Sequence, residues 1–335
     1  MALSLAESVG SVRRPLLPKH AIRSGVGFLS NFGLGLRVVV VHPTFFRLSR
    51  LISCTVYLRG AAVSEYSAFA EAERIGWADI NRATGYVDLF AAVADQVVQP
   101  LLNAVDVSAG QSALDLCCGQ GNVAEALAAR GGKVVGVDFS RTMLELARKR
   151  MPGGVFVQAD VQNLPFHDTE FDAVISNVGV CHIPDQARAL AEARRILRPK
   201  GRFGMSVWCG PDRSPSYEMV YRTIKEYGAA NITAPPGPDF HQFSDPAFAN
   251  RTLSNAGFSN IAMEIVECGW TLPAPEGLFD IFAKGTVRAA MLLSRQPPGH
   301  YAAIRSALAE EVRRRFTDGG RWRVPTFAAI LSATA

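Results

Sequence analysis

The stretch that decides the fold is Ser112-Ala113-Leu114-Asp115-Leu116-Cys117-Cys118-Gly119-Gln120-Gly121-Asn122-Val123-Ala124. It reads as a short apolar strand with a carboxylate near its end, then a glycine turn, then the first turn of a helix. A second apolar strand that ends on a carboxylate, Lys133 to Asp138, comes shortly afterwards. Strand–turn–helix–strand units of this kind bind nucleoside cofactors across the carboxyl ends of their strands. The function of the chain therefore depends on which cofactor this turn accepts.

Strands and helices alternate on both sides of this stretch. Short apolar runs predict strands at Ala113–Cys117, Val134–Asp138, Val155–Gln158, Phe171–Ser176 and Arg202–Trp208. A strand at Ile261–Val266 and a last apolar stretch at Val324–Leu331 suggest an antiparallel hairpin at the sheet edge. We therefore expect an α/β fold, a doubly wound, Rossmann-like and mostly parallel seven-stranded sheet with an antiparallel edge hairpin and helical lid insertions.

Apolar residues at helical spacing predict the helices. Two lead-in helices are expected at Ser64–Ile75 and Tyr86–Val105. Within the alternating region, helices are expected at Asn122–Arg130, after a cap at Ser140, and from Asp185, itself the expected cap, to Leu197. Pro199-Lys200-Gly201 is expected to form a turn. Beyond residue 210, further helices are expected at Ser216–Tyr227, Asp245–Ala256, Glu276–Leu293 and His300–Arg315.

Composition and charge narrow the class of protein. The chain has 335 residues, 48% of them hydrophobic and 19% charged, as in an ordinary globular protein. Its net charge is +5, but residues 1–60 carry eight basic side chains and one acidic side chain, which leaves −2 for the remainder. The basic pI therefore does not indicate a nucleic-acid partner. The six cysteines form no C-x-x-C pair and none has metal-like spacing with a histidine, so we expect a reducing compartment and no metal.

Residues 1–60 differ from the rest of the chain. They are basic, nearly free of acid and without sustained periodicity. Their most apolar part, Val26 to Phe46, is interrupted by polar residues and proline, so no stable membrane insertion is expected. The segment is either an organelle-targeting extension or a disordered or artefactual one, and we favour the second interpretation. We expect a cytoplasmic protein, with targeting by residues 1–60 left open.

The glycine turn by itself does not identify the cofactor. Gly119 to Ala124 fits the dinucleotide fingerprint G-x-G-x-x-G/A, and Asp138 suits the ribose of NAD as well as that of an adenosine. However, Asp115 lies next to the turn, where a carboxylate would repel a pyrophosphate. Asp160 adds a third acid after the next strand, beside the apolar Leu164-Pro165-Phe166. These acids favour a ligand that carries an ammonium group and a sulfonium.

At these residues the sequence resembles the class I S-adenosylmethionine-dependent methyltransferases, specifically the group that includes the ubiquinone/menaquinone-biosynthesis type. The resemblance is strong over about residues 80–210 and loose in the tail. One departure is Cys117, which stands where the family has the first glycine of the turn. The matching segments are Leu114 to Gly121, Gly136 to Ser140 with Met143-Leu144, Ala159 to Phe166, Phe171-Asp172 and Leu197 to Gly201.

The resemblance implies a site and a domain organisation. Gly119 and Gly121 would let the backbone pass close to the methionine part of S-adenosylmethionine, Asp115 would organise its amino group, and Asp138 would accept both ribose hydroxyls. Other residues expected at the cofactor are Cys117, Phe139, Met143, Asp160, Val161 and Asn177. Residues 61–335 would form the methyltransferase domain, with lead-in helices at 61–107, the cofactor-binding core at about 108–210 and the acceptor and lid region at about 211–335.

The loop after the fourth strand, Ser176 to His182, would lie nearest the transferred methyl group. It lacks both the Asn/Asp-Pro-Pro-aromatic run of nucleic-acid amino-methyltransferases and the Pro-Cys nucleophile of cytosine C5 enzymes, so we expect a small-molecule acceptor. His182 is either a general base or a loop histidine that bonds to the backbone, and His241 is a weaker second candidate. Candidate walls of the acceptor pocket are Trp77, Tyr86, Tyr217, Phe240, Phe243 and Trp270.

We expect in-line methyl transfer from S-adenosylmethionine to a small-molecule acceptor. Two alternatives stay open at this point. One is an NAD(P)-dependent oxidoreductase of the Rossmann class, and the other is a non-catalytic binding protein that kept the fold. The acceptor, the atom methylated and the oligomeric state are not determined by the sequence.

Overall fold

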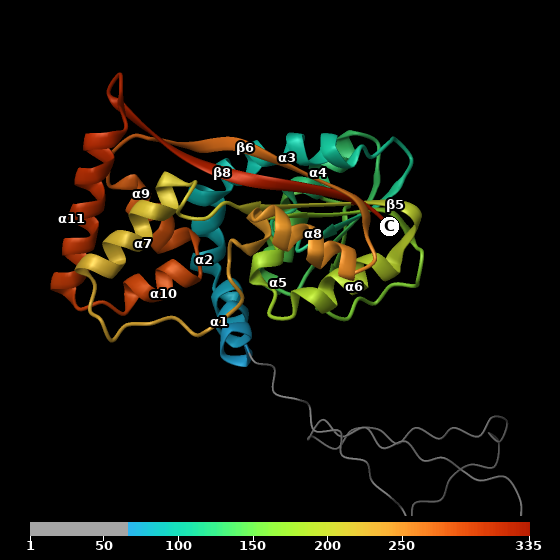
Figure 1. Cartoon of the computed structure of the whole chain (residues 1–335), viewed down its shortest axis with the longest axis horizontal. Helices are drawn as coiled ribbons and strands as arrows, with labels where there is room; N and C mark the ends of the chain where they lie inside the picture. Colours follow the sequence, from blue (N-terminus) through green and yellow to red (C-terminus); the bar gives the residue numbers. More distant parts are fainter. Residues whose placement is uncertain (1–65) are drawn as a thin grey trace, which may run out of the picture. The chain divides into compact units, whose positions relative to one another are not determined.

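A computed structural model of the chain describes residues 66–335, so the predicted extension at 1–60 lies outside the described residues. The central sheet has the strand order β3-β2-β1-β4-β5-β8-β6, with a two-residue strand β7 (Thr317–Asp318) paired to β8 (Figure 1). Five strands are parallel: β1 (Ser112–Leu116), β2 (Lys133–Asp138), β3 (Val155–Gln158), β4 (Phe171–Asn177) and β5 (Leu197–Trp208). The predicted doubly wound, mostly parallel sheet is confirmed.

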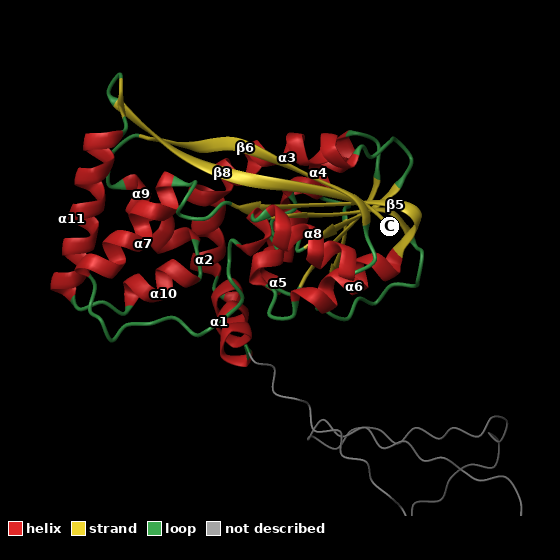
Figure 2. Ribbon diagram, in the orientation of Figure 1, coloured by secondary structure: helices red, strands yellow, loops and turns green. Residues whose placement is uncertain are grey.

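The middle strand β1 is covered on both faces. Ala113 contributes to the core that contains α3 (Ala91–Val105), whereas its neighbour Leu114 points to the other face and packs with residues of α6 (Gln186–Ile196). Figure 2 shows α3 and α4 (Asn122–Ala129) on one side of the sheet and α6 and α8 (Pro246–Asn255) on the other. Helix α5 (Arg141–Arg150) packs against β3. Helices on both faces explain why the strands read as continuous apolar runs.

Side-chain caps begin three of these helices. The hydroxyl of Ser140 accepts from the backbone N–H of Met143 at the start of α5. Asp185 accepts from the N–H of Arg188, at 3.0 Å, and Asp245 accepts from that of Phe248, at 2.6 Å. Each cap satisfies a helix N–H that has no partner within its own helix. The predicted caps Ser140 and Asp185 are confirmed.

The antiparallel edge consists of β6 (Ser259–Leu272) and β8 (Arg321–Thr334). Strand β8 lies between β5 and β6 and is antiparallel to both. The expected antiparallel edge pair is therefore present, but no tight turn joins its strands. Three helices lie between them in the chain, α9 (Gly277–Gly285), α10 (Arg288–Ser294) and α11 (Pro298–Arg315). The chain therefore leaves the sheet after β6, forms these helices and returns to the sheet as β8.

Strand β5 begins earlier than its sequence predicts. The turn expected at Pro199-Lys200-Gly201 lies inside the strand, as an irregularity in the pairing with β4 between Phe171 and Ala173. Lys200 has a φ of 65°, in the left-handed region. Turn residues in the middle of a strand are typical of a bulge, which bends the strand without ending it.

The lead-in region contains more elements than the two helices expected. Helix α1 is Ser67–Ala78, three residues later than predicted. The predicted helix Tyr86–Val105 begins as a π-helix, η1 (Tyr86–Phe90), which follows α2 (Ile80–Gly85) and leads into α3. Asp79 caps α2 by accepting from the N–H of Asn81. Apolar spacing alone does not distinguish a π-turn from an α-turn.

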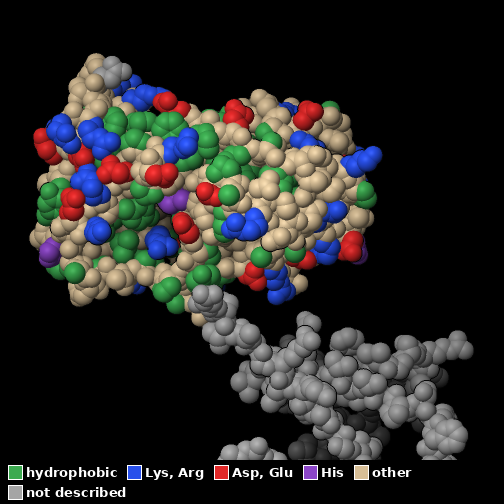
Figure 3. All heavy atoms as spheres, viewed as in Figure 1, with side chains coloured by type: hydrophobic (Ala, Val, Ile, Leu, Met, Phe, Trp, Pro, Cys, Tyr) green, Lys and Arg blue, Asp and Glu red, His purple; other side chains and the backbone are tan. Residues whose placement is uncertain are grey.

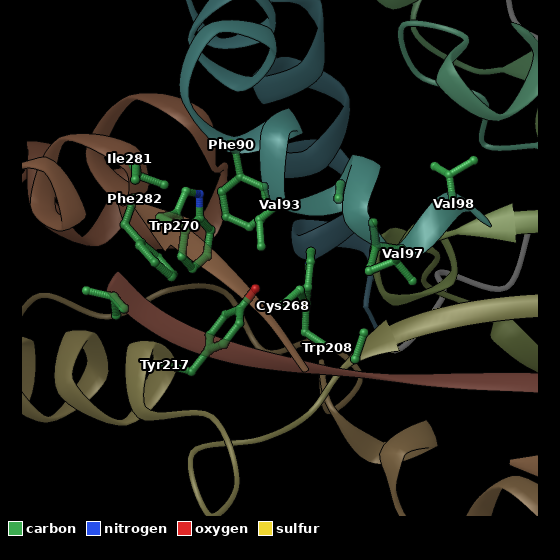
Figure 4. Packing of buried hydrophobic residues seen from close by; sticks show 14 of the residues in the cluster. Phe90, Val93, Val97, Val98, Trp208, Tyr217, Cys268, Trp270, Ile281 and Phe282 are labelled. Atoms are coloured by element: carbon green, nitrogen blue, oxygen red, sulfur yellow. The ribbon is translucent and has the colours of Figure 1, made fainter. Parts of the chain in front are cut away.

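The expected helix Glu276–Leu293 is also wrong, because it divides into α9 and α10 at Thr286, whose backbone is extended. Gly285 ends α9 where that helix crosses η1 closely, and a Cβ there would lie 3.1 Å from the Cβ of Phe90. Phe90 in turn packs edge-on against Trp270 and Phe282 (Figure 4). Together with α7 (Pro215–Tyr227) and α11, these helices form a layer beyond the carboxyl ends of the parallel strands (Figure 1).

Candidate functional site

A cavity of about 400 Å³ lies at the carboxyl ends of β1, β2 and β4. Its walls come from the strand ends, from α1 and η1, and from α7, α9 and α10; we call it the central cavity. Hydrophobic side chains show on the part of the surface that the helical layer forms (Figure 3). Of the predicted site residues, the following line the central cavity: Asp115, Cys117, Gly119, Asp138, Phe139, Met143, Asp160, Val161, Asn177 and His182.

The turn after β1 is built from residues with left-handed backbone. Cys117 has a φ of 59°, Gly119 of 51° and Gly121 of 80°. Cys117 is thus in a conformation that glycine adopts more easily, as the family pattern at this position implies. A Cβ at Gly119 would meet only the methyl end of Met143, at 4.0 Å, so the glycine leaves this side of the turn open.

Gly121 was expected at the cofactor and is not among the residues that line the central cavity. A Cβ at this glycine would lie 3.2 Å from the Cβ of Ala147 and 3.3 Å from the ring of Phe156. Its small size and positive φ therefore serve the packing of the turn against α5 and β3. The expectation that it opens space for a ligand is corrected accordingly.

Asp138, at the end of β2, is 6% exposed and uses both carboxylate oxygens. Oδ2 accepts from the backbone N–H of Gly119 at 2.9 Å, and Oδ1 accepts from that of Ser140 at 2.8 Å. Each oxygen keeps a further lone pair. Burial raises the pKa of Asp138, against the effect of these hydrogen bonds. The two N–H donors hold the carboxylate in one orientation at the cavity wall.

Asp115 is 1% exposed and accepts from the backbone N–H of Ala124, in the first turn of α4, at 2.9 Å. Burial raises its pKa to about 8, a shift that this hydrogen bond partly offsets. Within residues 66–335, neither Asp115 nor Asp138 forms an ion pair. Two buried acids at the wall of one cavity without a cationic partner suit a ligand that brings positive charge.

Asp160, which follows β3, and Asn177, the last residue of β4, both line the central cavity. Asp160 is exposed, and its carboxylate accepts from the backbone and side-chain N–H groups of Gln162. Asn177 is held from two elements, because its amide donates to the carbonyl of Ala94 and accepts from the hydroxyl of Ser206. Its side chain therefore joins α3 to the sheet at the cavity wall.

His182 lies in a short 3-10 turn, η2 (Val180–His182), after β4. Its Nδ1 is 2.8 Å from the carboxylate of Glu73, a buried residue of α1. Burial disfavours the charged imidazole, but Cys181 and the Glu73 carboxylate raise the pKa of His182 well above its usual value. The alternative of a histidine side chain bonded to the backbone is therefore wrong.

Four of the six candidate wall residues are confirmed at the central cavity, namely Trp77, Tyr86, Tyr217 and Phe240. Trp270 and Phe243 are instead buried in two separate parts of the core. His241 does not line the central cavity, because its Nδ1 donates to the carbonyl of Trp208 at 3.0 Å. Burial also lowers the pKa of His241.

Several cavity residues carried no signal in the sequence. Glu73 and Arg288 are charged residues on helices that lie far from the glycine turn in the chain. Tyr221 follows Tyr217 by one helical turn on α7, and the two rings stack at 6.3 Å. An aromatic pair at i, i+4 could have indicated that α7 faces the site, whereas nothing local distinguished Glu73 or Arg288 from surface residues.

Two further observations concern metal-binding clusters and membrane-spanning helices. Within residues 66–335 there is no cluster of three or more histidine, cysteine or acidic side chains that could hold a metal ion. In the same part of the chain, no helix combines the length and the hydropathy needed to cross a bilayer.

The chain is similar in sequence to a known domain family and to several known proteins. The sequence model of the methyltransferase domain family matches residues 114–205. A 2-phytyl-1,4-naphtoquinone methyltransferase of Trichormus variabilis is 36% identical over 172 residues, which cover 48% of this chain and 73% of that protein. A demethylmenaquinone methyltransferase of Renibacterium salmoninarum is 30% identical over 185 residues, or 51% of this chain and 71% of that protein.

Among solved structures, a phosphoethanolamine N-methyltransferase 2 of Haemonchus contortus in complex with S-adenosyl-L-methionine is 17% identical, with a TM-score of 0.45. The match covers 71% of this chain and 52% of that one. The sequence relatives give no support to an oxidoreductase or to a non-catalytic binding protein. The chain belongs to the class I S-adenosylmethionine-dependent methyltransferases and is an enzyme that methylates a small-molecule acceptor.

Proposed function

We propose that the central cavity binds S-adenosylmethionine at the ends of β1 to β3 and an aromatic acceptor on the side of the helical layer. The observation that supports this most strongly is the pair of buried acids, Asp115 and Asp138, without an ion-pair partner among the described residues. They flank the turn that Gly119 leaves open. A cationic ligand with hydroxyl groups would complete both the charge and the hydrogen bonding of this wall.

The surroundings of each residue in the proposed cofactor site suggest its role. Asp138 would accept the two ribose hydroxyls with its remaining lone pairs, since both of its oxygens are already oriented by backbone N–H groups. Asp115 would face the amino group, beside the backbone of Cys117. Exposed Asp160 and buried Val161 would hold the edge and the face of the adenine, with Phe139 and Met143 on the other side.

The side chains that line the cavity would orient the cofactor and the acceptor and would exclude water. When bound, the cofactor supplies an electrophilic methyl group whose departure leaves a neutral thioether. Alignment of the acceptor with that methyl group therefore accounts for much of the rate. Asn177, fixed between α3 and β5, and the walls from α1, α9 and α10 would set the distance between the two ligands and keep the site dry.

The side of the central cavity that η1 and α7 form is aromatic. Tyr86, Tyr217 and Tyr221 line it, and their hydroxyls form no hydrogen bond with other residues in 66–335. Burial raises the pKa of Tyr221 to about 12, so the phenol stays protonated and can donate. Because two of the relatives are named as naphtoquinone and demethylmenaquinone methyltransferases, we propose a reduced quinone or a similar hydroxylated aromatic molecule as the acceptor.

We also propose a cytoplasmic location. The five cysteines in the described part of the chain are free thiols, four of them buried, which suits a reducing compartment.

The cofactor site is tested by calorimetric titration with S-adenosylmethionine and S-adenosylhomocysteine. Asp138→Ala should weaken both affinities at least about tenfold through the loss of ribose contacts. Asp88→Ala, which removes an exposed carboxylate of η1, should leave them unchanged. Absence of binding by the unaltered protein at high micromolar ligand would sink the proposed cofactor site.

The acceptor class is tested separately with chemically reduced 2-phytyl-1,4-naphthoquinone and methyl-labelled cofactor. Transfer of label to the hydroquinone is the expected result. Cofactor binding without any transfer to this probe or to simpler naphthohydroquinones would refute the acceptor class and leave the cofactor site standing.

A further inference from the structure

A buried carboxylate from the lead-in region reaches the loop after β4. Glu73 of α1 is 4% exposed, and its Oε2 lies 2.8 Å from Nδ1 of His182. The same oxygen accepts from the indole N–H of Trp77, one helical turn later, at 2.9 Å. All three side chains line the central cavity. Neither the sheet nor the packing of α1 requires a buried acid at this position, because an apolar residue would fill it at lower cost.

The ring of His182 is fixed on several sides. Trp77 and Phe240 contact it edge-on, with ring centroids at 5.4 and 5.3 Å. Since Nδ1 is engaged by Glu73, the neutral imidazole carries its proton on Nδ1 and leaves Nε2 as an acceptor. Because the pKa of His182 is raised, this neutral form is populated at a higher pH than in an ordinary histidine. The hydrogen bond to Glu73 is at Nδ1, and the other side chain of the described residues that interacts with the ring through a polar group is the Cys181 thiol. The arrangement is that of an imidazole base oriented by a carboxylate.

We propose that His182 takes the proton from a hydroxyl group of the aromatic acceptor, and that Glu73 is the positioning residue that orients the imidazole for this step. The proposal rests on the proposed function of the cavity. In the step, the O–H bond of the acceptor breaks, its electron pair stays on the acceptor, and an N–H bond forms at Nε2. The charge left on the acceptor makes its oxygen, or a ring carbon conjugated with it, a better nucleophile for the methyl group.

The charged and titratable groups around His182 either favour or disfavour its charged form. Glu73 from α1 and the Cys181 thiol from η2 favour the imidazolium. Asp138 from β2 is coupled to His182 as well, since the charged histidine lowers the pKa of that acid. Arg74 and Arg288, which line the same cavity from α1 and α10, oppose a second positive charge. Arg74 is paired with Glu71, so Glu73 remains the acid in direct contact with the ring.

The first experiment measures the titration of His182 by NMR of histidine-labelled protein in the presence of saturating S-adenosylhomocysteine. Glu73→Gln keeps the size of the side chain and removes the charge, so the pKa of His182 should fall. Glu71→Gln removes an exposed charge from the same helix and should leave it unchanged. An unaltered pKa of His182 in Glu73→Gln would overturn the role of Glu73.

The second experiment follows 4-nitrophenol, whose phenolate absorbs separately from the phenol. Below the solution pKa of this probe, the unaltered protein with saturating S-adenosylhomocysteine should bind it largely as phenolate, with the proton on His182. Glu73→Gln should lower the ratio of bound phenolate to phenol roughly tenfold or more, and His182→Gln should abolish the ionisation. Absence of binding, or equal ionisation in His182→Gln, would overturn the proposal.

A failure of the proposed function can be distinguished from a failure of the proposed proton transfer. All four proteins should still bind S-adenosylhomocysteine, because Glu71, Glu73 and His182 are not assigned to the cofactor. Loss of that binding in the unaltered protein would refute the proposed function, whereas intact binding with an unperturbed probe refutes only the proton transfer. If Glu73→Gln fails to fold, His182→Gln, which changes a partly exposed side chain, still decides the second experiment.

Discussion

Asp115 is a residue that would favour ligand binding but lowers the stability of the protein without the ligand. It is buried beside a turn, and among residues 66–335 its side chain forms one hydrogen bond, with the N–H of Ala124. With a pKa of about 8 in the folded state and about 3.8 in the unfolded chain, the carboxyl group is ionised in the unfolded chain at neutral pH and protonated in the folded protein. Folding therefore takes up a proton here, and a cationic ligand would release it.

This predicts a pH effect of definite sign. Between about pH 4 and pH 8 the folded state binds one proton more than the unfolded state, so Asp115 lowers the free energy of unfolding as the pH rises. Relative to Asp115→Asn, the unaltered protein should lose up to about 1.4 kcal/mol per pH unit in this range. Urea denaturation of both proteins at several pH values measures the difference; parallel curves would contradict it.

The same substitution should act oppositely on the ligand. Asp115→Asn should weaken S-adenosylmethionine binding and remove the proton release that accompanies it in the unaltered protein. Calorimetry in two buffers of different ionisation enthalpy separates these effects. Equal proton release by both proteins would mean that Asp115 does not face the ammonium group.

At the scale of elements, the spacing of α3 from the sheet depends on a glycine in β5. A Cβ at Gly204 would collide with a methyl group of Val105, the last residue of α3, and would approach Leu101 to 3.3 Å. Gly204 has ordinary strand backbone, so close approach and not φ requires the glycine. This contact holds the helix whose other end presents Ala94 to Asn177.

We therefore predict that Gly204→Ala destabilises the protein by about 1–3 kcal/mol through overpacking. Val105→Ala removes the colliding methyl groups, so the double variant should recover part of that loss. The coupling energy should be favourable and about 0.5–3 kcal/mol. Gly299→Ala, where nothing lies within 4 Å, is the matched control in the same denaturation experiment. Strict additivity of the two changes would show that α3 does not rest on β5 in this way.

At the scale of the molecule, the site is assembled from distant parts of the chain. The acids come from β1 and β2, His182 from the loop after β4, Glu73 from α1, and Tyr217 from α7. Two further walls, α9 and α10, belong to the connection between β6 and β8. Residues Val63–Ala335 form one compact unit that contains every residue lining the central cavity.

We predict that a chain beginning at Val63 keeps the cofactor affinity of the full-length protein. All lining residues lie at or after Ala70, so residues 1–62 contribute no described contact to the site. Calorimetry with S-adenosylhomocysteine on the two proteins checks this. A second chain that begins at Ile80 lacks α1 and therefore Glu73. In this chain the ionisation of bound 4-nitrophenol should decrease more than the affinity for the cofactor. Loss of cofactor affinity in the first truncation would refute the domain boundary.

The sequence by itself determined the sheet and the cofactor. Apolar strands that end on Asp115 and Asp138, with a glycine turn between them, specify the order of elements and the chemistry of the ligand, because these signals are local and repeat along the chain. The local signals failed where long-range packing decides: the bend within β5, the π-turn at Tyr86 and the break at Thr286.

Only the tertiary structure decided the acceptor side. It separated Trp77 and Tyr217, which face the central cavity, from Trp270 and Phe243, which lie in the core, although all four are aromatic residues in apolar surroundings. It also brought Glu73 to His182 across 109 positions of the chain. The role of a buried carboxylate depends on the group that it contacts. The spacing of residues within α1 cannot indicate a partner that the loop after β4 supplies.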